Sequence, residues 1–259
     1  PYIYLELILG PNEPIPVQKY LEFADINVFP YSFMIGNAFH QKNLKSLQKL
    51  NEQLPPSEKS IVFLENHDLE RMDKFKNQLI LSLHDQKLHQ LGSVFMLTWP
   101  YGYPQVYSGF QFPNYDAGSG TQTVLNSNGE CLEPWSCQHR ALGIAALAQF
   151  RNHTNSFFNI SNWWNYGKDQ IAFSRGKLGF VVINLSAHSL NHVIPTDLRD
   201  GTYCNILSKN YDDQSKSCPS GINVKMNKIS IELEPYSALV LQSNIKIDSQ
   251  KDAVKKVLK

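Results

Sequence analysis

The sequence lacks three features: a charge excess of either sign, a cysteine spacing suited to zinc, and an apolar run of membrane length. Its 24 Lys and Arg residues against 23 Asp and Glu leave a formal net charge of +1. This balance gives no electrostatic reason to expect nucleic acid or an anionic membrane as a partner. No apolar run reaches the roughly 20 residues of a transmembrane helix, and no signal peptide is visible. With 42% hydrophobic and 18% charged residues, the composition is that of a globular protein with a sizeable core.

The four cysteines fall into two local pairs. Cys131 and Cys137 enclose five residues, and Cys204 and Cys218 enclose thirteen. Because neither pair has the two-residue spacing of a zinc knuckle, two local disulfides are the better interpretation. Disulfides indicate an oxidising compartment, so we expect a secreted protein. Three Asn-x-Ser/Thr sequons, which are candidate glycosylation sites although such triplets are common by chance, lie at Asn152, Asn159 and Asn184.

Strands and helices are predicted to alternate over residues 1–155. Apolar runs typical of strands, and leucine-rich stretches with helical spacing, follow one another about every 30 residues. The predicted strands are 2–9, 25–31, 60–65 and 105–108, and the clearest helices are 44–54, 79–97 and 139–150. Such a rhythm predicts four βα units, which is the C-terminal half of a (β/α)8 TIM barrel in an α/β protein.

From about residue 156 the pattern changes to short apolar runs separated by turns. These runs predict an antiparallel β-sandwich domain over residues 156–244. The predicted strands include 170–175, 179–184, 189–193, 202–207, 224–226, 228–233 and 237–241. Residues 245–259 are rich in lysine and lack an apolar face, so we expect a basic tail. Since the sequence begins on a strand without an initiator methionine, we expect it to be a piece of a longer protein.

Polar residues gather at the ends of two predicted strands. Asn66, His67 and Asp68 follow the apolar run 61–64, and Glu6 interrupts the first strand. In a barrel the strand ends converge on one cleft, so we expect Glu6 and Asp68 to face each other. Glycoside cleavage needs one protonated carboxyl group to donate to the leaving oxygen and one ionised carboxylate near the developing positive charge. Taken singly, Asp68 equally fits a helix N-cap, and either carboxylate fits a salt bridge.

Both segments resemble those of a known enzyme family. Residues 2–8 are similar to the general-acid segment of the α-amylases of glycoside hydrolase family 13, and 63–71 to the segment that carries the third catalytic carboxylate. Glu65 stands where animal-type members usually have Asp. Further similarity to these animal-type members extends, in order, up to Gln242. It runs through 95–97, 100–103, 135–140, 150–152, 162–165 and 201–204.

The resemblance implies a role for each residue of the site. Glu6 is similar to the acid that protonates the glycosidic oxygen, Asp68 to the carboxylate that supports the transition state, and His67 to the imidazole that binds the sugar hydroxyls. The implied activity is retaining hydrolysis of internal α-1,4 bonds in starch or glycogen by a protein that is monomeric at full length. The family's nucleophile and calcium ligands precede the matched segments. Hence calcium is implied, no metal ligand is named here, and the sequence alone is expected to be inactive.

The sequence departs from the animal pattern at the chloride site and in one loop. Gln105 stands where chloride-activated members have a basic residue that shares the ion with the Asn equivalent to Asn66. Because a neutral amide cannot supply the charge that favours a buried anion, we predict chloride independence, with Asn66 and Gln105 hydrogen-bonded nearby. Residues 72–77 contain neither the Gly nor the His of the family's mobile loop.

Two other functions remain compatible with the sequence. One is a non-catalytic amylase-like protein that binds glucan or another partner, and the other is transglycosylation. An Asp in an Arg-x-Asp context a few dozen residues before Glu6 would favour the enzyme over the binding protein. The Trp163-Trp164 pair is interpreted as part of the β-domain core rather than as a platform for sugar.

Overall fold

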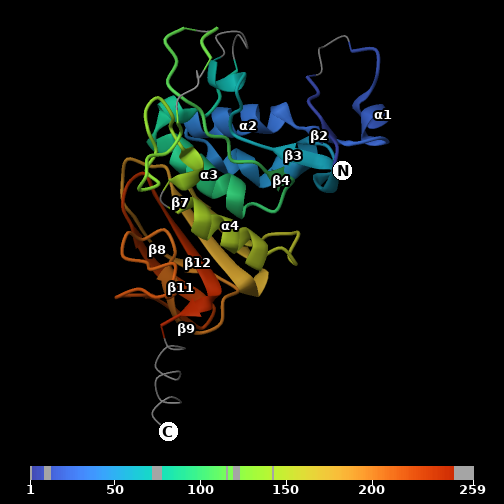
Figure 1. Cartoon of the computed structure of the whole chain (residues 1–259). Helices are drawn as coiled ribbons and strands as arrows, with labels where there is room; N and C mark the ends of the chain where they lie inside the picture. The colour runs from blue at the N-terminus through green and yellow to red at the C-terminus, as the bar shows by residue number, and fades with distance from the viewer. Residues whose placement is uncertain are drawn as a thin grey trace. The chain divides into compact units, whose positions relative to one another are not determined.

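The computed structural model describes residues 2–8, 13–71, 78–114, 116–118, 123–141 and 143–247 (Figure 1). It divides into two compact units. The first consists of Pro1–Gln41, Lys49–Met96 and Tyr101–Ala141, and the second of Lys42–Gln48, Leu97–Pro100 and Leu142–Lys259. The predictions for residues 72–77 and for residues 248–259 of the tail lie outside the described residues, whereas residues 245 and 246, also assigned to the tail, end the last strand. Within the described ranges, no helix combines the length and hydropathy needed to cross a membrane.

The first unit contains a four-stranded parallel sheet in the order β1-β2-β3-β4. Its strands are β1 (Tyr4–Leu5), β2 (Asp25–Asn27), β3 (Ser60–Val62) and β4 (Tyr103–Pro104). Sequential strands are neighbours and all run in one direction, as in half of a (β/α)8 barrel, which confirms the predicted fold class. Their carboxyl ends therefore lie along one edge, where polar loop residues are brought together.

Helices follow the strands in the expected alternation. The α-helices are α1 (Val17–Leu21), α2 (Phe29–His40), α3 (Lys87–Thr98) and α4 (Ile144–His153). The 3-10 helices are η1 (Leu44–Gln53), η2 (Ser57–Lys59), η3 (Leu69–Arg71), η4 (Leu83–Asp85), η5 (Gln138–Arg140) and η6 (Gly176–Leu178). The predicted helix 44–54 is η1, which is interrupted at Lys49, and the predicted helix 79–97 begins only at Lys87.

The predicted strand 25–31 is present only over Asp25–Asn27 (β2), and helix α2 begins at Phe29, within its predicted end. Proline is tolerated in the first turn of a helix, because the amide it lacks would have no partner there, and Pro30 occupies that turn. The helix packs on the strand that leads to the site. Ser32 donates a 2.6 Å hydrogen bond to the carbonyl of Phe63, and Phe29 meets the Phe63 ring edge-on at 5.3 Å.

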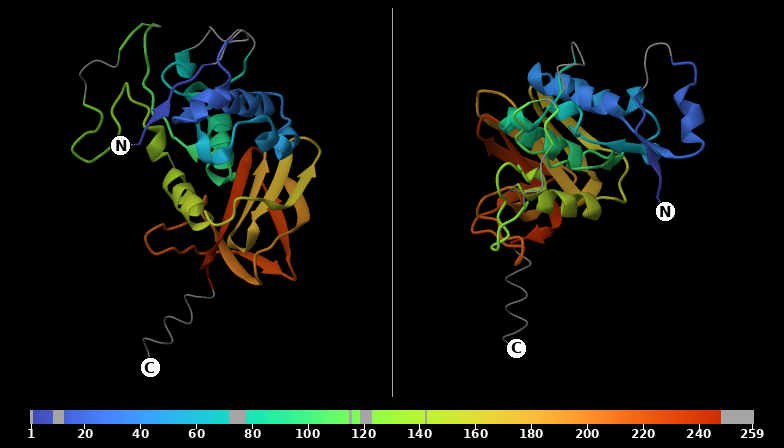
Figure 2. Two further views of the ribbon diagram at one scale, coloured as in Figure 1. Left: turned by 90° about the vertical axis from the view of Figure 1, so that its right-hand side faces the viewer. Right: turned by 45° about the horizontal axis from the view of Figure 1, so that its top comes forward.

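The second unit contains one eight-stranded antiparallel sheet in the order β5-β6-β7-β12-β9-β10-β11-β8, drawn from yellow to red in Figure 2. The strands are β5 (Ser161–Tyr166), β6 (Gln170–Arg175), β7 (Gly179–Asn184), β8 (Leu190–Pro195), β9 (Gly201–Asn205), β10 (Ile222–Lys225), β11 (Lys228–Leu233) and β12 (Ser237–Lys246). The predictions for β6, β7 and β11 match to the residue. On β11 exposed and buried side chains alternate, which is typical of a strand with one buried face, whereas β6 and β7 are buried along their whole length.

The sheet curls until its two outer strands approach each other, which gives it a nearly barrel-like, sandwich-compatible form. The His192 ring on β8 lies 5.4 Å from Trp164 and 4.5 Å from Tyr166, both on β5. Trp164 also packs against the apolar core, and Trp163 stacks on Phe173 at 6.3 Å. Both tryptophans therefore contribute to packing, as the sequence indicated.

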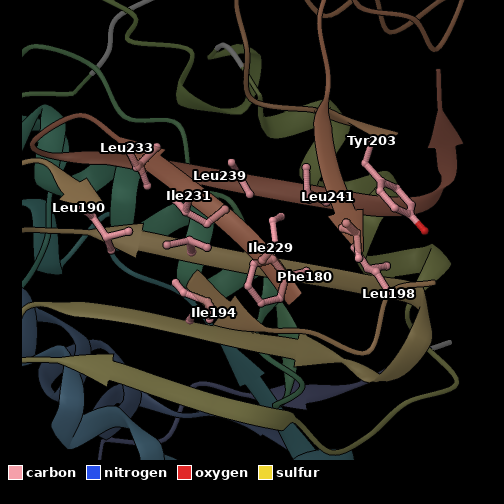
Figure 3. Close-up of a cluster of buried hydrophobic side chains, with 13 residues drawn as sticks. Phe180, Leu190, Ile194, Leu198, Tyr203, Ile229, Ile231, Leu233, Leu239 and Leu241 are labelled. Atoms are coloured by element: carbon pink, nitrogen blue, oxygen red, sulfur yellow. The ribbon is translucent and has the colours of Figure 1, made fainter. Parts of the chain in front are cut away.

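The core enclosed by this sheet is entirely apolar in character. Figure 3 shows side chains from several strands meeting in one cluster. The labelled members are Phe180, Leu190, Ile194, Leu198, Tyr203, Ile229, Ile231, Leu233, Leu239 and Leu241, all at most 9% exposed. Burial of so many large apolar side chains, each contributing about 1.5–3 kcal/mol before entropy is counted, is the main stabilising term of this unit.

A buried arginine joins three chain segments within the second unit. Arg175 is 2% exposed. Its guanidinium donates to the carbonyls of Thr98 (2.6 Å), Thr154 (3.0 Å) and Phe157 (2.6 Å). Burial, together with the positive charge of Arg151, lowers the pKa of Arg175 to about 9. The carbonyls at the ends of α3 and α4 supply partial negative charge in place of a carboxylate.

Both predicted disulfides are present. Cys131 is bonded to Cys137, with a Cα–Cα distance of 6.2 Å, and Cys204 is bonded to Cys218, with a Cα–Cα distance of 5.8 Å. Each closes a local loop, so each restricts the unfolded chain over a short span.

Candidate active site

The predicted site residues follow the carboxyl ends of three parallel strands. Glu6 comes directly after β1, Asn66 to Asp68 follow the extended segment that continues β3, and Gln105 comes directly after β4. The sheet order brings these strand ends to one edge. The edge is partly open to solvent, since Glu6 and His67 are exposed and Asp68 is of intermediate burial.

Glu6, His67 and Asp68 form a compact group. One carboxylate oxygen of each acid and one imidazole nitrogen of the histidine all lie within 4.8 Å of one another. The closest approach between His67 and Asp68 is 3.8 Å, from Nε2 to Oδ1. Two carboxyl groups and an imidazole at this distance can transfer a proton, stabilise a developing positive charge and bind hydroxyl groups. In the described part of the chain, this is the one grouping of three residues that offers ligands to a metal ion.

Asn66 links the two acids of this group. Its Nδ2 donates to Oε1 of Glu6 at 3.4 Å. Its Oδ1 accepts from the backbone amides of Asp68 (3.2 Å) and Leu69 (2.8 Å). An Asn that accepts from the amides two and three residues ahead closes a tight turn, so this side chain fixes the chain path on which Asp68 lies.

Gln105, which follows β4, is hydrogen-bonded to a residue of β1. Its Nε2 donates to the hydroxyl of Tyr4 at 3.3 Å. The sequence suggested that Asn66 and Gln105 are hydrogen-bonded nearby, and each amide is bonded to a residue of the β1 segment: Asn66 to Glu6 and Gln105 to Tyr4.

Two buried acids, which flank the triplet Asn66-His67-Asp68 in the sequence, were not identified from the sequence as part of the site. Glu65 accepts hydrogen bonds from the Leu83 amide (2.9 Å) and from Gln138 (3.0 Å), and it pairs with His89 at 3.0 Å. The sequence could have indicated that Glu65 has buried partners, because a charged residue at the end of an apolar run needs them. Those partners lie 18 to 73 residues away in sequence, so the sequence could not identify them.

Glu70 is the second buried acid. Its side chain is fully buried and accepts a hydrogen bond from the Tyr107 hydroxyl. Burial raises the pKa of Glu70, and the hydrogen bond from Tyr107 acts in the opposite direction. Gly109 makes room for this carboxyl group, since a Cβ there would lie 2.0 Å from Oε2.

An open cavity of about 530 Å³ begins beside Glu70 and Arg71. Phe112 and Asn114 line it as well. The Arg71 guanidinium lies 4.6 Å from the centre of the Phe112 ring and 5.1 Å from that of Phe110. The surface next to Asp68 therefore combines aromatic rings, charge and hydrogen-bonding groups.

Comparisons with known proteins identify the same family in both units. Residues 161–244 match the family model of the α-amylase C-terminal all-β domain. An α-amylase of Pecten maximus is 31% identical over 228 residues, covering 84% of this chain and 44% of the relative. An α-amylase of Streptomyces violaceus is 35% identical over 207 residues, covering 79% of this chain and 35% of the relative.

The chain belongs to the α-amylase family. The crystal structure of α-amylase I from Eisenia fetida, at 22% identity, has the same fold with a TM-score of 0.80 over 93% of this chain and 53% of that one. The chain spans less than half the length of the two curated relatives named above.

Proposed function

We propose that the protein hydrolyses internal α-1,4 bonds of starch or glycogen with retention of configuration. The proposal rests on one observation above all, the approach of Glu6, His67 and Asp68 within 4.8 Å at the carboxyl edge of a parallel sheet. The matching α-amylases of Pecten maximus and Streptomyces violaceus support the same reaction class. The nucleophilic carboxylate of a retaining mechanism would come from a strand that precedes Glu6 in the family pattern.

Each residue of the group has a defined task in this reaction. Glu6 donates its proton to the glycosidic oxygen and then accepts one from the attacking water. Asp68 remains ionised and stabilises the positive charge that develops on the sugar ring. His67, which is more exposed than Asp68, donates a hydrogen bond to hydroxyl groups of the same sugar. Asn66 contacts Glu6 directly and sets the turn that carries Asp68.

No step of the proposed reaction involves calcium. Within the described residues, the one grouping of three metal-ligating side chains is Glu6, His67 and Asp68, and the reaction assigns these to substrate. The calcium that the family implies is proposed to be bound by residues that precede Glu6 in the family pattern.

We also propose that the protein acts outside the cell as a monomer and without chloride. The two local disulfides support an oxidising compartment. Gln105 supports chloride independence, because an amide already bonded to Tyr4 carries no positive charge to hold an anion. The substrate is an α-glucan polysaccharide.

The test is hydrolysis of amylose by the full-length protein that contains this chain. Glu6→Gln is expected to lower kcat by roughly 10²- to 10⁴-fold, and Asp68→Asn by roughly 10²- to 10³-fold. Proton NMR of the first products should detect the α-anomer. Glu58→Gln is the matched control and should retain wild-type rates, because this exposed glutamate lies in η2, before β3, whereas His67 and Asp68 follow that strand. Binding of maltoheptaose without cleavage would favour the non-catalytic alternative, and cleavage that persists in Glu6→Gln would contradict the assigned role.

A further inference from the structure

The Glu65 side chain is more buried than any residue of the triplet Asn66-His67-Asp68 that follows it. Its side chain is 1% exposed. Oε2 accepts from the Leu83 amide, while Oε1 accepts from Gln138 and pairs with Nε2 of His89. Burial of a carboxylate is costly unless its oxygens are hydrogen-bonded, and both oxygens of Glu65 are. The three partners come from η4, α3 and η5, so one side chain joins the end of the β3 segment to three separate elements.

The residues after Glu65 are fixed at both ends. Glu65 fixes the start, and Leu69, which is 1% exposed and packs with Phe29 and Phe63, fixes the end. Between them, the Asn66 side chain closes the turn through the amides of Asp68 and Leu69. His67 and Asp68 themselves are substantially exposed, so their own contacts constrain them little. Their placement depends on the backbone that Glu65 and Leu69 restrain.

We infer that Glu65, through His89 and Gln138, is a positioning residue for His67 and Asp68. This inference rests on the proposed glucan hydrolysis and adds a determinant to it. Glu65 does not contact substrate; it acts by setting where the Asn66–Asp68 backbone lies. Reacting groups must be placed to within a fraction of an ångström, and a misplacement of about 1 Å costs up to roughly 100-fold in rate.

The alternative is that Glu65 and His89 form a buried pair that only stabilises the fold. The two roles predict different effects when Glu65 or His89 is substituted. A purely stabilising pair, when broken, lowers the melting temperature but leaves kcat of the folded molecules unchanged. A positioning residue lowers kcat while KM changes little, because the transition state loses more than the bound substrate does.

The experiment measures kcat, KM and melting temperature for variants of the full-length protein on amylose. Glu65→Gln and His89→Phe are each expected to lower kcat by about 10- to 100-fold with KM within about twofold of wild type. His89→Gln keeps a hydrogen-bond donor toward Glu65 and should restore most of kcat. The double variant Glu65→Gln/His89→Phe should be no slower than the slower single variant, because the two residues act as one unit.

The control is Ser60→Ala on the same strand. Ser60 is 2% exposed and bonds to Pro56 and Tyr101, so its loss should lower stability without lowering kcat. Unchanged kcat in Glu65→Gln and His89→Phe, with a lower melting temperature, overturns the positioning role while the proposed function stands. A wild-type protein that cleaves no glucan overturns the proposed function and, with it, this inference.

Discussion

The Tyr107 hydroxyl donates a 3.0 Å hydrogen bond to Oε1 of Glu70, while Oε2 of the same carboxyl group has no hydrogen-bond partner in the described part of the chain. A buried carboxylate with one oxygen left unsatisfied is costly to ionise. Glu70, two residues after Asp68, is therefore a buried acid whose charge state affects stability, although its Oε1 also lies 3.8 Å from Nε of Arg71.

Glu70→Gln is expected to stabilise the protein at neutral and alkaline pH. Because the pKa of Glu70 is raised by burial, its contribution to stability is full below the unfolded pKa of about 4.3 and is lost as the pH rises through the folded value. The amide carries no charge at any pH, so the melting temperature of the variant should exceed that of wild type by roughly 2 to 4 °C at pH 8. The difference should shrink toward pH 4. Scanning calorimetry across this range checks the prediction, with Glu58→Gln as the exposed control; a gain independent of pH would contradict it.

Gln105→Arg is expected to create a dependence on chloride. The new guanidinium would place a positive charge on the strand end beside Tyr4 and Glu6, where an anion would then be favoured. Amylose hydrolysis should be insensitive to chloride in wild type and should rise with chloride concentration in the variant. Nitrate and sulfate at equal ionic strength separate specific binding from screening. Loss of wild-type activity on removal of chloride would show that Gln105 is not the determinant.

Arg175→Met is expected to destabilise the second unit by about 3 to 5 kcal/mol. The substitution leaves the carbonyls of Thr98, Thr154 and Phe157 without their donor in a buried environment. Arg175→Lys should recover only part of the loss, because an ammonium group lacks the planar fork that reaches separate carbonyls. Urea unfolding measures the change, and Arg199→Met at an exposed position is the control. A loss below about 1 kcal/mol would mean that water satisfies these carbonyls.

The sequon at Asn184 is expected to carry no glycan, in contrast to those at the exposed Asn152 and Asn159. Asn184 is fully buried, and its Nδ2 donates to the carbonyls of His188, Leu233 and Glu234. The nitrogen that would bear a sugar thus has no free space. Peptide mapping of the protein from a secretory host checks this, with Asn159→Gln to identify the glycan at that site. A glycan found on Asn184 in folded protein would contradict the buried arrangement.

The sequence predicted the elements whose signals are local. Strands such as 170–175 and 228–233 have turn residues at both ends and side chains that suit the sheet, so their limits could be read directly. The strand predicted over 25–31 ends at Asn27 instead, because Pro30, which closes that apolar run in the sequence, lies in the first turn of helix α2. Local sequence does not distinguish these two uses of proline.

In the candidate site, too, some residues could be predicted from the sequence and others could not. Glu6, His67 and Asp68 could be proposed together because parallel strand ends converge, which is a property of the fold class. The supports of Glu65 and Glu70 could not, because His89, Gln138 and Tyr107 have no sequence signal that assigns them to a buried carboxylate. Side-chain partners far apart in the chain become visible only when the fold is known.

The contact of His192 with Trp164 and Tyr166 has a consequence for self-association. β5 and β8 are the two outer strands of the eight-stranded sheet, and outer strands normally present unpaired amides and carbonyls to which another chain can add. Aromatic rings bring these two edges against each other. This closure is expected to disfavour growth of the β-domain into fibrils through strand addition.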